Sequence, residues 1–276
     1  MKRLIGTLLA FSSAAATCVC AQSPEPIASA DVMSRISIFS YREGPKSDLF
    51  LRGTLFAPMT EGRVEVEYQD GNAEIDVKVD DLPDPASFGP YTAYVLWALT
   101  PDGRAASQGV LLEFAGGDGD LETSYGGSQF ALIVTAEPHF AVTAPSTMVV
   151  LYNVADDVKG DEAKITTVTE QADYSGLSSM PIDENESPPW LVQARYAVAI
   201  AAAAGAERFA PQAYEIAREK LAAAEDAARG RKKKAAREAA HDLAHEAVVA
   251  SEDARRAARA RALARLSGIF AQTGTK

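Results

Sequence analysis

Cysteine is nearly missing from this chain, and it occurs only at one end. The 276 residues include two cysteines, Cys18 and Cys20, and none follows them. The sequence after Cys20 therefore excludes disulfide bonds, a thiol nucleophile and cysteine-ligated zinc. A fold that forms there must be stabilised by its hydrophobic core alone.

Motifs for catalysis and for cofactor binding are lacking as well. The sequence has no Gly-x-Ser-x-Gly nucleophile motif and no glycine-rich loop of the kind that cradles phosphate. Histidine occurs only at His139, His241 and His245, and the sequence itself brings no Ser, His and Asp together. We therefore predict a protein that is not an enzyme and that needs no cofactor.

The longest apolar run lies at the N-terminus. Lys2 and Arg3 precede the apolar residues 4–16, and small residues follow up to Ala21. This pattern predicts a signal peptide over residues 1–21, cleaved during export to the periplasm or outer envelope. Thr17 and Val19 are poor residues before a lipidated cysteine, which favours this over a lipoprotein signal. Apart from that run, which is itself shorter than the roughly 20 residues of a spanning helix, no stretch approaches membrane-spanning length. We therefore predict no transmembrane helix in the mature chain.

Composition and charge divide the chain into two parts. The hydrophobic content of 47% is ordinary for one large or two small globular domains. Residues 22–187 hold 9 Lys and Arg against 28 Asp and Glu, a net charge of −19, whereas residues 188–276 hold 16 against 10, a net charge of +6. This asymmetry suggests that basic helices could attract an acidic domain in the same chain.

Residues 46–153 have the alternation of β-strands. Apolar and polar residues alternate over 64–68 and 75–79 on either side of a turn at 69–72, which predicts a hairpin. Seven or eight short runs of this kind, separated by turns, predict an antiparallel β-sandwich with Trp97 in its core. Residues 22–45 form a lead-in segment before it. Residues 154–187 are acidic and predict a mobile linker, with one more possible strand at 165–169.

Residues 188–268 have helical periodicity instead, followed by a tail at 269–276. Alanine recurs at steps of three and four in three successive segments, which predicts an antiparallel helical hairpin or three-helix bundle with close-packed seams. Gly205 and Gly230 are suited to end helices, and Pro211 to begin one. The fold class predicted for the whole chain is α+β, with sheet and helices in separate domains.

The helical part resembles an alanine-rich helical domain of unknown function that occurs in bacterial envelope proteins. The resemblance covers about residues 188–266 and depends most on the turn between Gly205 and Pro211. Some members also carry a peptidoglycan-binding domain of the outer-membrane protein A type, which this sequence does not contain. The resemblance thus implies a place in the cell envelope, and without that domain it leaves direct attachment to the cell wall open. The residues expected to mediate interaction at this turn are Gly205, Arg208, Phe209, Pro211 and Tyr214.

The last predicted helix holds the sharpest candidates for metal ligands. Glu238 and His241, like Asp242 and His245, are a carboxylate and a histidine three residues apart, as in di-metal helical bundles. A di-metal site needs a second such pair on another helix, and the remaining histidine, His139, is in the strand region. We therefore expect these four residues on a solvated helix face, pointing away from the seam, and predict no metal.

A basic run follows Gly230. It has no interleaved aromatic residues for base stacking, and nucleic acid is not expected outside the cytoplasm, so we interpret it as a solvated turn that can contact an acidic partner. Its residues are Arg231, Lys232, Lys233 and Lys234.

Taken together, these features predict a non-catalytic, exported envelope protein that is a structural or protein–protein interaction module. Its partners would be another envelope protein or a second copy, bound through the helices. One alternative is a sandwich that binds a glycan or peptide with loops at 84–91 or 116–127. The other is a metal-binding protein or metal-dependent enzyme that uses the last helix.

Overall fold

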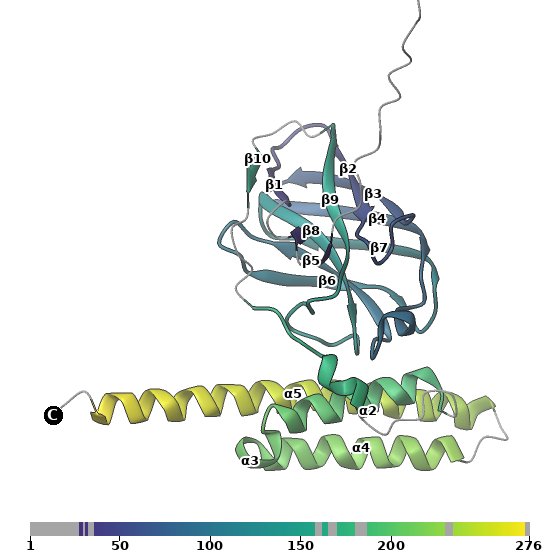
Figure 1. Cartoon of the computed structure of the whole chain (residues 1–276), viewed down its shortest axis with the longest axis vertical. Coiled ribbons are helices and arrows are strands. Elements are labelled where there is room, and N and C mark those ends of the chain that lie inside the picture. Colours follow the sequence, from purple (N-terminus) through teal and green to yellow (C-terminus); the bar gives the residue numbers. More distant parts are fainter. Residues whose placement is uncertain are drawn as a thin grey trace, which may run out of the picture.

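The computed structural model describes residues 28–29, 31–32, 36–157, 162–164, 170–179, 187–229 and 234–273. An antiparallel sheet is followed by helices that lie along one end of it (Figure 1), which confirms the predicted α+β class. The predicted signal peptide, the strand at 165–169, Gly230 and the basic residues 231–233 lie outside the described residues.

The described strands form one ten-stranded sheet with the order β10-β1-β8-β9-β2-β3-β4-β7, in which β5 pairs with both β8 and β6. Thr123 of β7 donates a hydrogen bond from Oγ1 to the carbonyl oxygen of Gln108 of β6, at 2.9 Å. The sheet therefore curls so far that β6 and β7 lie side by side. The strands are β1 (Ser37–Ser40), β2 (Ser47–Gly53), β3 (Glu61–Gln69), β4 (Asn72–Leu82), β5 (Ala93–Leu99), β6 (Ala105–Glu113), β7 (Gly117–Tyr125), β8 (Gln129–Glu137), β9 (Val149–Asp157) and β10 (Glu162–Lys164).

The β3–β4 hairpin shows how local sequence produces the sheet. Val64 and Val66 are buried while Glu65 between them is exposed, because side chains alternate between the two faces of a strand. At the turn, Asp70 and Gly71 have φ values of 52° and 84°. Two consecutive residues with positive φ are what a tight hairpin turn requires, so the predicted hairpin is confirmed.

Two segments outside the predicted strand region also belong to the sheet domain. The lead-in segment contains β1, which pairs with β8 and β10. Residues 170–179, which we predicted to be part of a mobile linker, form a short 3₁₀ helix, η2 (Ser175–Ser179), and bury Tyr174 and Leu177 in the core. Burial of these two large apolar side chains holds the segment on the sheet despite its acidic composition.

The helices are α2 (Pro189–Ala203), α3 (Ala206–Phe209), α4 (Pro211–Arg229) and α5 (Lys234–Thr273). The described residues between 187 and 273 thus hold four helices, because the turn around Gly205 separates α3 as a single turn. Gly205 has a φ of 79°, in the left-handed region that favours glycine. Pro211 begins α4 as predicted, and α5 continues past residue 268 into the predicted tail.

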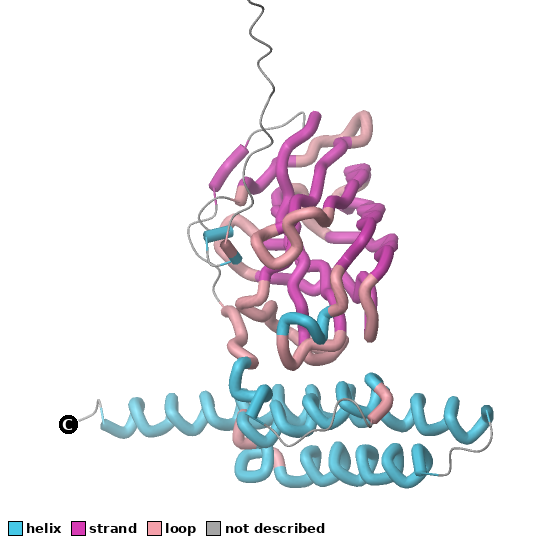
Figure 2. Tube along the Cα trace, turned by 45° about the vertical axis from the view of Figure 1, so that its right-hand side comes forward, coloured by secondary structure: helices cyan, strands magenta, loops and turns pink. Residues whose placement is uncertain are grey.

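Helices α2 and α5 lie next to the sheet, and α4 lies on their far side (Figure 1 and Figure 2). Val192, Tyr196 and Ile200 join the core of the sheet, whereas Leu191 and Ala194 join a second core with α4 and α5. A helix that buries two opposite faces is apolar nearly all round. The chain therefore has continuous packing from sheet to helices.

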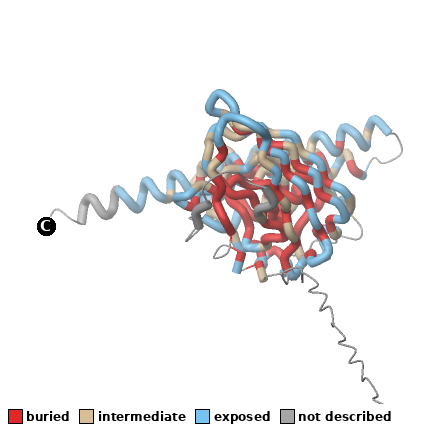
Figure 3. The backbone as a smooth tube through the Cα atoms, turned by 90° about the horizontal axis from the view of Figure 1, so that it is seen from above, coloured by how far each residue is buried: buried red, intermediate tan, exposed pale blue. Residues whose placement is uncertain are grey.

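The predicted alanine seams are largely buried. In α4, Ala217, Ala224 and Ala228 are buried. In α5, Ala240, Ala247 and Ala254 are buried, but so are Ala244, Val248 and Ala258, so the packed surface of α5 is wider than one seam. Figure 3 shows buried residues in the middle of the molecule and exposed residues toward both ends of α5. No helix in the described ranges is long and apolar enough to cross a membrane.

Candidate functional site

The turn predicted to mediate interaction makes its described contacts within the chain. The Arg208 guanidinium lies 5.1 Å from the centre of the Phe209 ring. Arg261 of α5 donates a hydrogen bond to the Phe209 carbonyl oxygen, at 2.8 Å. Tyr214 packs on a small cluster in which Ala206 and Ala210 are buried with two alanines of α5, Ala254 and Ala258. In these contacts, the residues from Gly205 to Tyr214 hold α3 and the start of α4 on α5.

The candidate metal ligands are on α5, and the two histidines among them also contact aromatic side chains. His241 and His245 are exposed, but neither points freely into solvent. The His245 ring stacks on Phe140 with ring centres 4.2 Å apart, and His241 meets the Trp190 ring edge-on at 6.0 Å. Each exposed histidine thus also contacts an aromatic ring, from Phe140 in the β8–β9 loop or from Trp190 in α2. No group of three or more His, Cys, Asp or Glu that could hold a metal occurs in the described chain.

Of the other candidates, Glu238 is exposed and pairs with Lys234, at 3.6 Å, one helical turn away. Asp242 lies 3.8 Å from the His241 ring nitrogen. Lys234 is the described member of the basic run and begins α5 with an exposed side chain. These contacts are those of a solvated helix surface.

Two buried ionisable groups at the end of β8 were not foreseen. The Glu137 carboxylate is fully buried and accepts hydrogen bonds at Oε1 from the Thr135 hydroxyl and from the Ser146 N–H. The Thr135 hydroxyl in turn accepts one from the Trp97 indole N–H, at 2.8 Å. Glu137 Oε2 and His139 Nδ1 are buried and have no hydrogen-bond partner among the described residues.

Burial shifts these two groups in opposite directions. Loss of solvation raises the pKa of Glu137 to about 8, and it lowers the pKa of His139 to about 4. Both groups are therefore neutral at pH 7. Burial, with the nearby Glu137, also raises the pKa of Tyr174.

The same region holds an ion pair that joins α5 to the sheet domain. Arg255 donates two hydrogen bonds to the Glu252 carboxylate, each at 2.7 Å, and a third to the Thr143 hydroxyl in the β8–β9 loop. Thr143 donates to Glu252 at 2.8 Å. The two charged side chains are only 10% and 6% exposed. We call the group formed by Glu137, His139, Thr143, Tyr174, Glu252 and Arg255 the buried junction.

Further polar contacts flank the buried junction. Gln193 of α2 donates to the Thr92 hydroxyl and to Glu113, both at 2.9 Å, and Arg259 of α5 pairs with Glu170. These contacts fix α2 and α5 on the sheet. The acidic and basic groups of the buried junction are at most 10% exposed, and their contacts orient the elements that they join.

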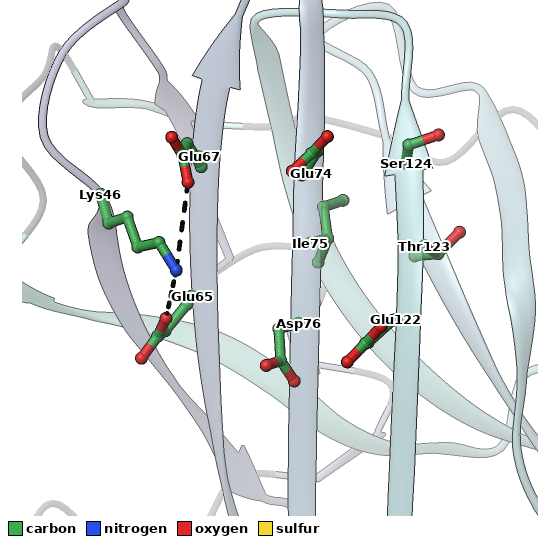
Figure 4. Close-up of a pocket in the computed structure, with 9 residues that line it drawn as sticks. All are labelled: Lys46, Glu65, Glu67, Glu74, Ile75, Asp76, Glu122, Thr123 and Ser124. Carbon is green, nitrogen blue, oxygen red and sulfur yellow. Dashed lines mark hydrogen bonds and ion pairs between the residues drawn. The ribbon is translucent and has the colours of Figure 1, made fainter.

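A surface hollow of about 550 Å³ lies on the outer face of β3, β4 and β7 (Figure 4). Lys46 lies 2.9 Å from Glu65 and 4.0 Å from Glu67, and its hydrogen bond lowers the pKa of Glu65. The described residues that line the hollow are Lys46, Glu65, Glu67, Glu74, Ile75, Asp76, Glu122, Thr123 and Ser124. Strongly negative charge is the chief property of this face.

The two loops proposed for ligand binding differ in structure, and residues of the first line a small cleft. Residues 84–91 contain the 3₁₀ helix η1 (Pro85–Phe88), which Asp84 caps by accepting from the Ala86 N–H. Between η1 and α2 lies a cleft of about 230 Å³, smaller than the roughly 300–1,000 Å³ of small-molecule sites. Residues 116–127 are mostly strand β7.

Exposed apolar side chains form two further groups that sequence reasoning missed. Leu55, Phe56 and Met59 lie in the β2–β3 loop, which we call the apolar loop; Met59 is 89% exposed. Leu263 and Leu266 of α5 are 62% and 51% exposed. The last buried residue of α5 is Ala258 among those whose side chains are described. We call residues 262–273 the α5 overhang, and Figure 1 shows this end projecting beyond the other helices.

Comparison of the chain with family models, with curated proteins and with solved structures gave no match.

Proposed function

We propose that this chain is a non-catalytic, exported protein of the cell envelope that acts as a structural or protein–protein interaction module. The observation that carries this proposal is the α5 overhang. It extends a helix by about 18 Å, at 1.5 Å per residue, beyond the described contacts that support the rest of α5.

The energetics of a free helix favour a partner. Isolated helices shorter than about 12–15 residues are marginal in water, and most helical stability in proteins comes from packing of an apolar face. Leu263 and Leu266 are three residues apart and share one face of the overhang. Two large apolar side chains on one side of a projecting helix are typical of a surface that another molecule covers.

The character of the buried ionisable groups supports a non-catalytic role. Among the carboxyl and imidazole groups of the described chain, Glu137 and His139 have the largest pKa shifts, and such groups are normally the first candidates for catalysis. In this protein both groups are buried, and Glu137 accepts hydrogen bonds from Thr135 and Ser146 of the sheet domain.

The N-terminal sequence supports export, and the resemblance of residues 188–266 to alanine-rich envelope domains supports a periplasmic or outer-envelope location. The absence of cysteine after residue 20 is compatible with a periplasmic location and with an outer-envelope location. For the sheet domain we propose the finer description of two packed layers, a β-sandwich, around Trp97.

Site-specific photo-crosslinking in cells tests the interaction. A photoreactive residue at position 263 should give an adduct heavier than the monomer, whereas one at Ile216, which is exposed on α4, serves as the matched control. The absence of any adduct at 263 would contradict the proposal. Cell fractionation followed by N-terminal sequencing tests export: the purified protein should begin at or near Gln22.

A further inference from the structure

The apolar loop and the α5 overhang account for five of the seven large apolar side chains that are exposed among the described residues; the others are Ile216 and Val249. Both groups are exposed in the same chain, so neither covers the other. Each therefore lacks a partner within the described structure.

The apolar loop is surrounded by negative charge. Phe56 packs edge-on against Phe88 of η1 at 5.8 Å, and Thr60 at the loop end donates to the Asp81 carbonyl oxygen at 3.0 Å. These contacts bring the loop next to exposed carboxylates on β3, β4, η1 and β7. Arg52 lies opposite Glu61 in the ladder, which still leaves an excess of negative charge around the loop. The surrounding carboxylates are Glu61, Asp80, Asp81, Asp84 and Asp118.

The α5 overhang has the opposite charge. Arg261 at its base and Arg265 within it are exposed, and no Asp or Glu follows Asp253 in the sequence. On a helix of 3.6 residues per turn, Arg261 and Arg265 lie about 200° around the axis from Leu263. The overhang therefore has an apolar side and, opposite it, a cationic side.

We propose that the α5 overhang of one copy docks on the apolar loop of a second copy, an inference that rests on the proposed interaction function. The opposite net charges of the overhang and of the surroundings of the apolar loop favour the approach of these two surfaces. One contact between them covers both exposed apolar groups. Pairing of two overhangs would cover only one group and would bring two cationic segments together.

The contact joins two different surfaces, so it is heterologous, and each copy keeps a free overhang and a free loop. Such contacts build open chains or closed rings. The mass of the purified exported chain, measured by sedimentation, should rise with protein concentration. It should fall when the ionic strength is raised from about 0.1 M to about 1 M, because the Debye length shortens from about 10 to about 3 Å.

Two double variants give the decisive test. The overhang variant carries Leu263→Ser and Leu266→Ser; the loop variant carries Leu55→Ser and Met59→Ser. Each should be monomeric alone, because it keeps only one of the two surfaces. Mixed in equal amounts, they should form a 1:1 dimer that grows no further. Ile216→Ser, an exposed change on α4, should leave the association of the wild-type chain unchanged.

Other outcomes overturn the inference. If the loop variant still associates with itself, the overhang does not dock on the loop. A wild-type chain that stays monomeric at all concentrations rules out the second copy, and an adduct between residue 263 and a different protein in cells would then leave the broader interaction function intact. If the overhang variant does not fold, Arg265→Glu replaces it and should weaken association at least tenfold.

Discussion

Glu137 and His139 are two residues apart on the chain, yet burial moves their proton affinities in opposite directions. In an apolar environment the charged form is penalised, so the acid keeps its proton to higher pH and the base loses it at lower pH. The folded protein thus holds one more proton than the unfolded chain at Glu137 and one fewer at His139, over different pH ranges. Stability depends on pH through these differences.

The sign of each contribution follows from proton binding. Glu137 has a pKa of about 8 when folded and 4.5 in its ordinary state, so its contribution to stability falls as pH rises from 4.5 to 8. His139 has a pKa of about 4 when folded against 6.5, so its contribution rises from pH 4 to 6.5. The two effects oppose each other below pH 6.5, and only the fall remains above it.

We therefore expect the free energy of unfolding to decrease between about pH 6.5 and 8, on the order of 2 kcal/mol at about 1.4 kcal/mol per unit. Glu137→Gln, which keeps the size of the side chain and cannot ionise, should remove this decrease. Denaturant unfolding across that pH range measures it. The same decrease in the variant would mean that Glu137 is not its source.

Arg255 and Glu252 allow a second test at the residue scale. Arg255→Met alone leaves a buried carboxylate without its cation and should destabilise the protein by about 3–5 kcal/mol. Arg255→Met combined with Glu252→Met should cost less than the sum of the two single changes, because no unpaired charge remains. Simple additivity in this cycle, measured by denaturant unfolding, would show that the pair is not coupled.

Some of these residues could be found from sequence and others could not. Trp97 was predicted in the core because it lies in the most apolar strand, and it is fully buried. Glu137 gave no comparable signal, since its environment comes from residues far apart in sequence, such as Ser146 and Tyr174. The pairing of Arg255 with Glu252 has ordinary helical spacing, and what makes it unusual is Thr143 in a distant loop.

Among the elements, α2 shows what periodicity reveals and what it hides. Its seam toward the other helices was predicted from Leu191 and Ala194, which are buried. The opposite stripe of Val192, Tyr196 and Ile200 has equally good spacing, but sequence alone does not say that a sheet lies there. The strands followed the same rule: alternation marked β3 and β4, whereas the four-residue β1 is too short for a pattern.

The turn between α2 and α3 gives a prediction for a single element. Gly205→Ala should lower the free energy of unfolding by about 1–2 kcal/mol, because the backbone is left-handed and the new Cβ would lie 3.2 Å from the Phe209 ring. Gly126→Ala, where no atom lies within 4 Å and φ is not positive, is the matched control and should have little effect. Equal effects of the two changes in thermal unfolding would exclude a special role for this turn.

For the whole molecule, the important finding is that sheet and helices share packing. The sequence divided the chain by charge and periodicity into two domains, which led us to expect a linker between them. Tyr174 and Leu177 from that region, and Tyr196 from α2, all enter the core of the sheet. The acidic composition of residues 154–187 could not indicate that this segment packs on the sheet, because the packing depends on the burial of a few residues such as Tyr174 and Leu177.

Shared packing implies cooperative unfolding. Far-UV circular dichroism, dominated by the helices, and the tertiary signal of Trp97 should change together as denaturant is added. Tyr196→Ala, which removes a buried aromatic ring from the face of α2 that meets the sheet, should shift both curves by about 3–5 kcal/mol. Separation of the two curves in the wild-type protein would show that sheet and helices unfold independently.

Helix α5 is continuous from the buried junction to the overhang, and its 40 residues span about 60 Å. The side chains that anchor it to the sheet therefore also set the direction in which its far end points. If copies join through that end, every copy meets the next with the same rotation and the same step. The expected product is a regular helical filament, or a ring where the rotation closes, and electron microscopy of concentrated protein would show its repeat.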